Sequence, residues 1–389
     1  MRRLSFKSRA GRLARIFVGS AVGAALIVAL GAAAPAAGLR ARSAAVTDFK
    51  FGLRGVSVLS SSDAWAVGES SAVLHWNGTS WAKVTIPDMP IGTFLYAVDA
   101  LSRSDVWAAG YGFAQGGPDT TLIVHWNGTA WKRVPSPGSF SYPRFPSVTG
   151  LSMDSATDGW VVGSVSNNVT GASTALALHW NGATWQRVTT SPAFDFTGVA
   201  SFPPANATAV GRDRTSSQQG VPAAFRWNGG TWALAADLPV PPGMPASQVA
   251  GPYQLSALSA TDIWGAGTGV TSTGVTKNLA WHWNGTRWSV MSMSLGGGPR
   301  AVAAISPSNV WAVGSTTING FGKHAPWSAH WNGTRWTQVP TPQPSVSDGL
   351  LLGVGAAGPR NVWAVGDSND THLHHTLILH WNGSSWVQT

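Results

Sequence analysis

The sequence predicts an all-β protein, a seven-bladed β-propeller with four antiparallel strands in each blade. The first observation is a Trp-Asn-Gly motif with a second Trp behind it, which occurs seven times along the 389 residues. The second is the spacing of this motif, 47 to 56 residues, a period that indicates a repeat architecture. The third is that 20 of the 22 tryptophans fall at three positions of the repeat, and only Trp281 and Trp327 lie outside it.

The motif itself predicts a hairpin. Asn-Gly between runs of β-branched and aromatic residues favours a type I′ turn, because that turn needs positive φ at both central positions. A two-residue loop in the first copy would place Trp76 opposite Thr79 and Leu74 opposite Trp81. Side chains alternate along a strand, so Trp76 and Trp81 share one face and His75 takes the other. A longer loop would shift this register.

The second repeat provides the template for a whole blade. Residues 94–101 and 106–110 form its first two strands, 121–126 and 131–134 its last two, and turn residues stand at each junction. Applied to the other copies, this template predicts blades at residues 51–86, 92–137, 145–192, 196–238, 252–293, 298–342 and 349–389. The last blade already ends in a fourth strand, so we expect blade one to close on blade seven by side-chain packing. Residues 46–50 could still add to an outer edge.

Two further features recur in the blades. A Ser-x-x-Asp or Ser-x-x-Asn turn precedes the second strand, and we expect its Asp or Asn side chain to close the turn onto backbone amides. Blade four departs from the pattern, because Thr208 stands where other blades have Trp and Arg226 replaces the His before Trp-Asn-Gly. A neighbour must fill the resulting gap, or a cavity remains.

The N-terminal residues predict export. Residues 1–42 contain a basic stretch, an apolar run and an Ala-Pro-Ala cleavage pattern, which indicates a secretory signal peptide or, if uncleaved, a membrane anchor. The domain at 46–389 is therefore expected to be secreted or extracytoplasmic, with membrane contact only through an uncleaved segment. Eight of the 25 Lys and Arg residues lie in these 42 residues, which leaves 17 basic against 16 acidic side chains. We therefore expect no nucleic-acid partner, and we expect a monomer.

The Asp-Val-Trp-Ala-Val-Gly and His-Trp-Asn-Gly-Thr-x-Trp motifs resemble those of Trp-rich tectonin and lectin-type propellers, and more loosely those of kelch and Asp-box propellers. The likeness covers about residues 51 to 389. It implies a binding module, since tectonin relatives commonly recognise glycans or other cell-surface ligands.

In such a blade the second-to-third loops and the blade-to-blade connectors lie on one face of the disc, which we call the connector face. These segments vary most among the repeats, and binding residues concentrate on variable loops of a rigid scaffold. Aromatic and polar side chains suit glycans and peptides alike. The predicted ligand-binding residues are Trp281, Trp327, Tyr111, Phe113, Arg212, Arg214, Lys277, Phe321, Lys323, His324, Tyr142 and Arg144, with Tyr253 and Arg300 as further connector candidates.

The histidines divide into two groups. The six that precede Trp-Asn-Gly are expected to be hydrogen-bonded structural residues, because they recur in nearly every blade. A weaker metal-site candidate lies in the blade-seven loop, where imidazoles and carboxylates cluster, although a solvated polar loop explains the same residues. Its members are His372, His374, His375, Asp367 and Asp370. No metal or other cofactor is expected.

Catalysis is not expected either. Glycoside hydrolysis usually needs two carboxyl groups or a tyrosine nucleophile with an acid partner, and the chain has one glutamate, four tyrosines and no cysteine. The leading expectation is an exported, non-catalytic module that binds a glycan or a cell-surface protein. The alternatives are a sialidase-like propeller glycoside hydrolase and a structural protein of the cell envelope.

Overall fold

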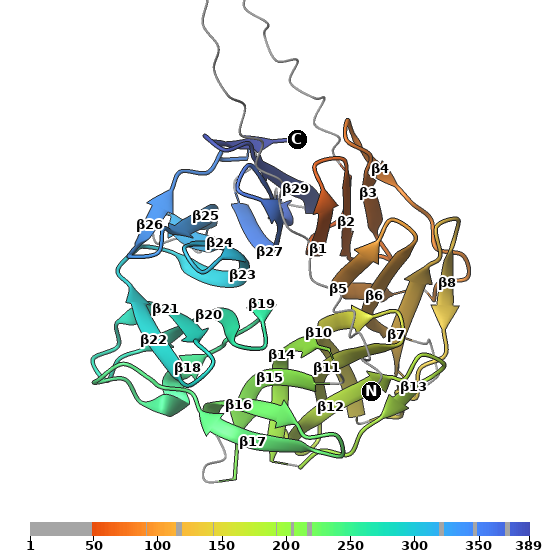
Figure 1. Cartoon of the computed structure of the whole chain (residues 1–389), viewed down its shortest axis with the longest axis horizontal. Helices are drawn as coiled ribbons and strands as arrows, with labels where there is room; N and C mark the ends of the chain where they lie inside the picture. Colours follow the sequence, from red (N-terminus) through yellow and green to blue (C-terminus); the bar gives the residue numbers. More distant parts are fainter. Residues whose placement is uncertain are drawn as a thin grey trace, which may run out of the picture. The chain divides into compact units, whose positions relative to one another are not determined.

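The computed structural model describes residues 49–389 except 91, 114–118, 143, 192, 204–205, 216–219, 319–322, 345–347 and 370–373. Residues 1–42, with the expected signal segment, therefore lie outside the described part. Within that part, no helix is both long and apolar enough to cross a membrane. Seven separate antiparallel sheets surround a common axis, which confirms the seven-bladed β-propeller (Figure 1).

Each blade runs outward from its innermost strand in sequence order. Blades one to three consist of β1 (Leu53–Ser60), β2 (Asp63–Gly68), β3 (Val73–Trp76), β4 (Trp81–Lys83); β5 (Thr93–Ser102), β6 (Asp105–Gly112), β7 (Asp119–Trp126), β8 (Trp131–Val134); and β10 (Arg144–Ser155), β11 (Asp158–Asn167), β12 (Ser173–Trp180), β13 (Trp185–Arg187). Blade four comprises β14 (Phe194–Phe202), β15 (Asn206–Asp213), β16 (Val221–Trp227) and β17 (Trp232–Asp237).

Blades six and seven repeat the four-strand order. They consist of β23 (Gly298–Ser306), β24 (Asn309–Ile318), β25 (Lys323–Trp331), β26 (Trp336–Val339); and β27 (Asp348–Gly358), β28 (Asn361–Asn369), β29 (His374–Trp381), β30 (Trp386–Gln388). In blade five the innermost strand is divided into β18 (Val249–Ala250) and β19 (Leu255–Ser259), which both pair with β20 (Asp262–Val270), followed by β21 (Thr276–Trp283) and β22 (Trp288–Met293). The short β9 (Ser139–Phe140) pairs with β7, and the 3₁₀ turn η1 (Ala246–Gln248) precedes β18.

The hydrophobic core consists of seven clusters, one between each pair of neighbouring blades. The cluster between blades seven and one contains Leu53, Trp76, Trp363 and Ile378. Blade seven contains only its own strands β27–β30 among the described residues, so the ring closes by side-chain packing, as expected. Of the residues 46–50 that could add to an outer edge, the structure describes only 49 and 50. The carbonyl oxygen of Phe49 accepts a hydrogen bond from the Thr376 amide in β29 of blade seven (2.9 Å), so a backbone contact adds to the side-chain packing where the ring closes.

A Trp–His–Asp unit, or its Asn equivalent, holds six of the seven interfaces on the face opposite the connector face. In blade one the indole of Trp65 stacks on His75 (4.2 Å between ring centroids), and His75 Nε2 donates to Asp63 Oδ1 (3.0 Å). The same indole packs against Trp126 and Trp131 of blade two. Equivalent pairs of Trp and His stack in four other blades and pack at a tilted angle in blade six, with Asn in place of Asp in blades six and seven. The six histidines are hydrogen-bonded structural residues, as predicted.

The turns differ from the sequence prediction. Trp76 pairs with Trp81 rather than with Thr79, so the loop contains four residues instead of two. The reason is an Asx-type turn, in which Asn77 Oδ1 accepts from the amides of Thr79 (2.9 Å) and Ser80 (3.0 Å), while Gly78 takes a φ of +96°. The turn between β1 and β2 is also closed differently from the prediction, because the Ser60 hydroxyl accepts from the Ser62 amide and Asp63 binds His75.

Candidate functional site

A ring of bulged residues surrounds the mouth of the central channel on the connector face. In β1 the pairing with β2 skips from Leu53↔Gly68 to Gly55↔Val67, so Arg54 is an extra residue. The innermost strands of blades two, three, four, six and seven have the same register shift, which leaves one unpaired residue in each. A β-bulge redirects the side chain of its extra residue. The bulged residues are Arg54, Tyr96, Thr149, Thr197, Arg300 and Leu352.

Blade five supplies the seventh residue by a different path. Leu255 pairs with Gly265, just as Val56 pairs with Ala66 in blade one. Counting two residues back along each innermost strand places Tyr253 at the position of Arg54. The Tyr253 amide donates to the carbonyl of Ala266 (3.1 Å), so this residue is held against β20 although it precedes β19. We call the seven residues the bulge ring.

A glycine of the second strand makes room for this geometry. A Cβ atom on Gly314 would lie 1.9 Å from the carbonyl oxygen of Gly298, and one on Gly110 would lie 1.8 Å from that of Phe94. The equivalent glycines of the other blades meet an inner-strand carbonyl in the same way. Only glycine allows so close an approach of two backbones, so the Gly of Trp-Ala-Val-Gly is a requirement of the bulge.

The bulge ring encloses a cavity of about 360 Å³, lined by Arg54, Tyr96, Thr149, Tyr253, Arg300 and Leu352 among other residues. Arg300 is exposed, and its guanidinium lies 5.1 Å from the centre of the Tyr253 ring. Arg300 has no ion pair among the residues that the structure describes. The cavity therefore combines a stacked, exposed positive charge with aromatic and hydroxyl groups.

A second hollow adjoins the first between blades five and six. Its volume is about 390 Å³, and Tyr253 and Arg300 line it together with Thr316, Thr317 and His324. His324 is positioned by Asp348, whose Oδ1 lies 3.4 Å from its Nδ1. Since Tyr253 and Arg300 line both hollows, one extended ligand can contact the ring and this side pocket at once.

Aromatic residues of blade two flank the ring. The rings of Tyr96 and Tyr111 stack at 5.4 Å, and their hydroxyl oxygens lie 3.2 Å apart. Burial and the hydrogen bond to Tyr96 raise the pKa of Tyr111, so the Tyr111 hydroxyl is a neutral donor or acceptor. Phe113 packs edge-on against Tyr111 and is 42% exposed. Tyr111 and Phe113 are thus predicted residues that lie beside the ring.

Other predicted residues lie apart from the ring or serve the scaffold. Arg214 forms an ion pair with Asp195 (2.5 Å), and Arg212 donates to the carbonyls of Gly220 and Val249. Tyr142, which lies on the blade-three connector and is 77% exposed, contacts Phe145 of β10. Three more are exposed on their own strands without a described link to the ring: Arg144, Lys277 and Lys323. Phe321 lies outside the described residues.

The expectation that Trp281 and Trp327 contact a ligand is wrong for this structure. Trp281 is 0% exposed and donates its indole N–H to the carbonyl of Pro239 (2.9 Å). Trp327 is 1% exposed and packs in the cluster between blades five and six. Both side chains fill space between sheets where the other blades use smaller residues, which explains why they occur outside the repeat.

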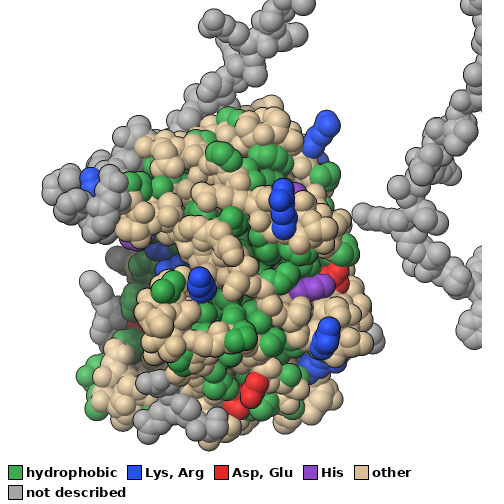
Figure 2. All heavy atoms as spheres, turned by 90° about the vertical axis from the view of Figure 1, so that its left-hand side faces the viewer, with side chains coloured by type: hydrophobic (Ala, Val, Ile, Leu, Met, Phe, Trp, Pro, Cys, Tyr) green, Lys and Arg blue, Asp and Glu red, His purple; other side chains and the backbone are tan. Residues whose placement is uncertain are grey.

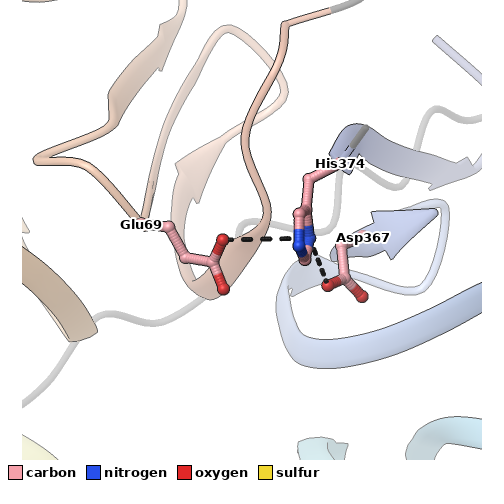
Figure 3. Close-up of side chains that lie close together, drawn as sticks. All are labelled: Glu69, Asp367 and His374. Atoms are coloured by element: carbon pink, nitrogen blue, oxygen red, sulfur yellow. Dashed lines mark ion pairs between the residues drawn. The ribbon is translucent and has the colours of Figure 1, made fainter. Parts of the chain in front are cut away.

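Figure 3 shows a charged cluster where blades one and seven meet. Asp367 Oδ2 lies 3.5 Å from His374 Nδ1, and Glu69 Oε2 lies 3.9 Å from the same nitrogen. Glu69 also accepts from Arg54 of the bulge ring. Burial raises the pKa of Asp367, and the Arg54 guanidinium partly offsets that rise. Burial would lower the pKa of Arg54, but its hydrogen bond and charge interaction with Glu69 raise it overall.

The cluster differs from the metal site considered in the sequence. Of the five candidates, the structure brings Asp367 and His374 together and adds Glu69, which the sequence did not indicate. His375 instead lies 3.0 Å from the Lys50 ammonium through its Nδ1, and His372 and Asp370 lie outside the described residues. One imidazole and two carboxylates can ligate a cation, but Arg54 already neutralises Glu69. The arrangement therefore favours a charge network that joins the two blades.

The central channel continues below the bulge ring as a cavity of about 470 Å³ lined by all seven innermost strands. Asp99 lines it and accepts a hydrogen bond from the Met153 amide (2.8 Å). Burial raises the pKa of Asp99 to about 6, against the opposing effect of its backbone hydrogen bonds. This carboxyl group is therefore partly protonated near pH 6.

Comparison with known proteins supports the fold. No family model and no curated protein matches the sequence. Among solved structures, YCF48 bound to D1 peptide is 14% identical with a TM-score of 0.50, over 85% of this chain and 95% of that chain. The GH74 xyloglucanase from Xanthomonas campestris is 13% identical with a TM-score of 0.56, over 89% of this chain and 55% of that chain.

The β-propeller domain of the Trilobed protease from Pyrococcus furiosus, described as having an open velcro topology, is 9% identical with a TM-score of 0.51, over 87% of this chain and 98% of that chain. At such identities these similarities establish the propeller fold alone. The tectonin and kelch likeness remains a resemblance of motifs.

The sequence prediction missed Arg54, Tyr96 and Thr149, because they lie on innermost strands rather than in loops. The sequence nevertheless contains a pattern that identifies these residues. In six blades the bulged residue is followed by Gly or Ala, as in Arg54-Gly55 and Arg300-Ala301. A Cβ on Gly55 would lie 2.9 Å from the Tyr96 carbonyl of the next blade. A small residue is needed where innermost strands converge, and it marks the residue before it as part of the ring.

Proposed function

We propose that the protein is an exported, non-catalytic binding module that recognises a glycan bearing acidic groups through the bulge ring and the adjoining side pocket. The observation that supports this proposal most directly is the exposed Arg300 stacked on Tyr253, at the junction of the two hollows. Aromatic faces pack against the apolar faces of sugar rings, while guanidinium and hydroxyl groups bind carboxylates and sugar hydroxyls. The N-terminal export segment is consistent with a ligand outside the cytoplasm.

A cell-surface protein is the other ligand class that fits these groups. Nucleic acid fits less well, because the positive charge of the mature domain is small and dispersed. On the rim in Figure 2, Lys and Arg side chains are separated by polar and hydrophobic surface rather than gathered in a stripe.

A glycan array that includes uronic-acid and sulfated oligosaccharides tests the proposal. Arg300→Ala and Tyr253→Ala should each weaken binding by at least tenfold, since each removes a group shared by both hollows. Lys277→Ala removes an exposed charge elsewhere on the connector face and serves as the matched control. Binding that persists in both ring variants, or binding of neutral and acidic glycans with equal strength, would contradict the proposed site. Retention of surface-protein binding without any glycan binding would favour the protein ligand.

A hydrolase is the second candidate, and one observation favours it. The carboxylate oxygens of Glu69 and Asp367 lie within 4.8 Å of each other, close to the separation of about 5–5.5 Å between the two carboxyl groups of retaining glycosidases. Against it, Glu69 is engaged by Arg54, and Asp367 is only 3% exposed. Release of reducing ends from an oligosaccharide that the protein binds, abolished by Asp367→Asn, would establish the hydrolase in place of the binding module.

A further inference from the structure

The interface between blades four and five lacks the aromatic pair that fills the six other interfaces. Thr208 pairs with Arg226 at the register position where Trp65 pairs with His75. A cavity of about 170 Å³ remains there, lined by Thr208, Ala224, Arg226, Trp283 and Trp288 among others. The sequence left open whether a neighbour fills this gap, and the structure shows that the cavity persists.

Trp283 and Trp288, on the blade-five side of the cavity, lack the indole that lies between the equivalent tryptophans of the other interfaces. In the other interfaces an indole lies between the two tryptophans of the following blade, as Trp311 does at 4.7 Å from Trp381 and 5.2 Å from Trp386. Trp283 and Trp288 still contact each other at 5.8 Å. Trp288 is nevertheless half-buried, whereas the six equivalent tryptophans on the fourth strands are buried. One face of Trp288 is thus available to a ring in the cavity.

Arg226 gives the opening of the cavity a positive charge. Its side chain is exposed, and its guanidinium lies 4.9 Å from the centre of the Trp283 ring. It has no ion pair among the described residues, whereas the histidine at this position in four other blades binds an aspartate. A ligand in the cavity therefore meets two indole surfaces inside and a guanidinium at the exit.

We propose that this cavity is a binding site for a small planar aromatic acid of one or two rings. The ring occupies the place that an indole fills in the other interfaces, and its acidic group binds the Arg226 guanidinium. An apolar cavity of about 150 Å³ in a protein core is large enough to bind benzene. Edge-to-face and offset contacts with Trp283 and Trp288 stabilise such a ring beyond the effect of burial alone. This site is independent of the bulge ring and of the proposed function.

Titration of the full-length protein with indole-3-acetate, followed by ligand-observed NMR and calorimetry, tests the proposal. Indole and acetate are tested separately. We expect indole-3-acetate to bind at least tenfold more tightly than indole, and acetate alone not to bind. Thr208→Trp should abolish binding because the introduced side chain fills the cavity, whereas Thr208→Val, which keeps the volume, should retain it.

Arg226→Gln provides a second test that leaves the cavity open. It should reduce the affinity for indole-3-acetate to that for indole without changing the affinity for indole. Absence of binding by both aromatic probes in the wild-type protein would overturn the proposal. Undiminished binding by a folded Thr208→Trp variant would do so as well, and an unchanged preference for the acid in Arg226→Gln would refute the role of the guanidinium.

Discussion

Completing the aromatic interface between blades four and five should stabilise the protein. The double substitution Thr208→Trp with Arg226→His restores the pair present in the other interfaces, and Asn206 stands where Asn309 accepts from His330. A dry core cavity costs about 24 cal/mol per Å³, so the 170 Å³ cavity corresponds to at most about 4 kcal/mol. Because the exposed Arg226 lines this cavity, the value for a dry cavity is an upper limit. We therefore expect a gain of about 1–2 kcal/mol in the free energy of unfolding.

Differential scanning calorimetry measures this gain as a rise in Tm of roughly 2–8 °C, from the shift of about 2–4 °C per kcal/mol for large domains. The two single variants complete a double-mutant cycle. The introduced indole and imidazole should couple by at least about 0.5 kcal/mol, since they stack on each other. Thr208→Val is the control that adds no ring and should leave Tm unchanged. A folded double variant whose Tm equals or falls below that of the wild type would refute the reasoning that an aromatic ring is missing from this interface.

Three further outcomes follow from the fold. Gly314→Ala should destabilise the protein by at least about 3 kcal/mol, since its Cβ would meet the Gly298 carbonyl at 1.9 Å. Gly296→Ala is the control, because a Cβ at that position meets nothing within 4 Å. Equal denaturation midpoints for the two variants would contradict the bulge geometry. Asp99→Asn should raise stability above pH 6 by up to about 3 kcal/mol but not at pH 4. The folded pKa of about 6 exceeds the ordinary aspartate pKa of 3.8, so the wild type loses stability as pH rises between these two values. A pH-independent difference would refute this. Glu69→Gln should lower the free energy of unfolding by about 1–3 kcal/mol, because it leaves the part-buried Arg54 without its anionic partner, and an unchanged urea midpoint would show that this pair does not stabilise the junction of blades one and seven.

The sequence predicted the blade count and ring closure because both depend on local, repeated patterns. Each Trp-Asn-Gly motif marks the outer hairpin of one blade, and a complete last repeat leaves no strand to exchange. The predicted type I′ turn was wrong because Asn-Gly suits both a two-residue hairpin loop and an Asx-type turn. Only the pairing of Trp76 with Trp81 distinguishes these alternatives.

The site was harder to predict, since it depends on register rather than on residue type. Loop candidates such as Tyr142 and Lys277 were chosen for exposure and chemistry, and exposure alone does not bring side chains together. Arg54 was overlooked because it lies within a strand, where alternation would direct it between sheets. The bulge that redirects it is visible only once Leu53 is paired with Gly68.

The repeats divide their positions between packing and recognition. Positions that hold the blades together vary little within the chain, since the same Trp–His pair recurs in six of seven blades and its loss in blade four leaves a cavity. The bulge ring varies widely, with Arg, Tyr, Thr and Leu at equivalent places. The scaffold glycine and the small residue after the bulge fix the backbone there, so the bulged side chain is free to differ from blade to blade. A position whose backbone is fixed by its neighbours and whose side chain varies has the properties required to determine ligand specificity. In this propeller five of the six bulged residues, together with Tyr253, line one cavity.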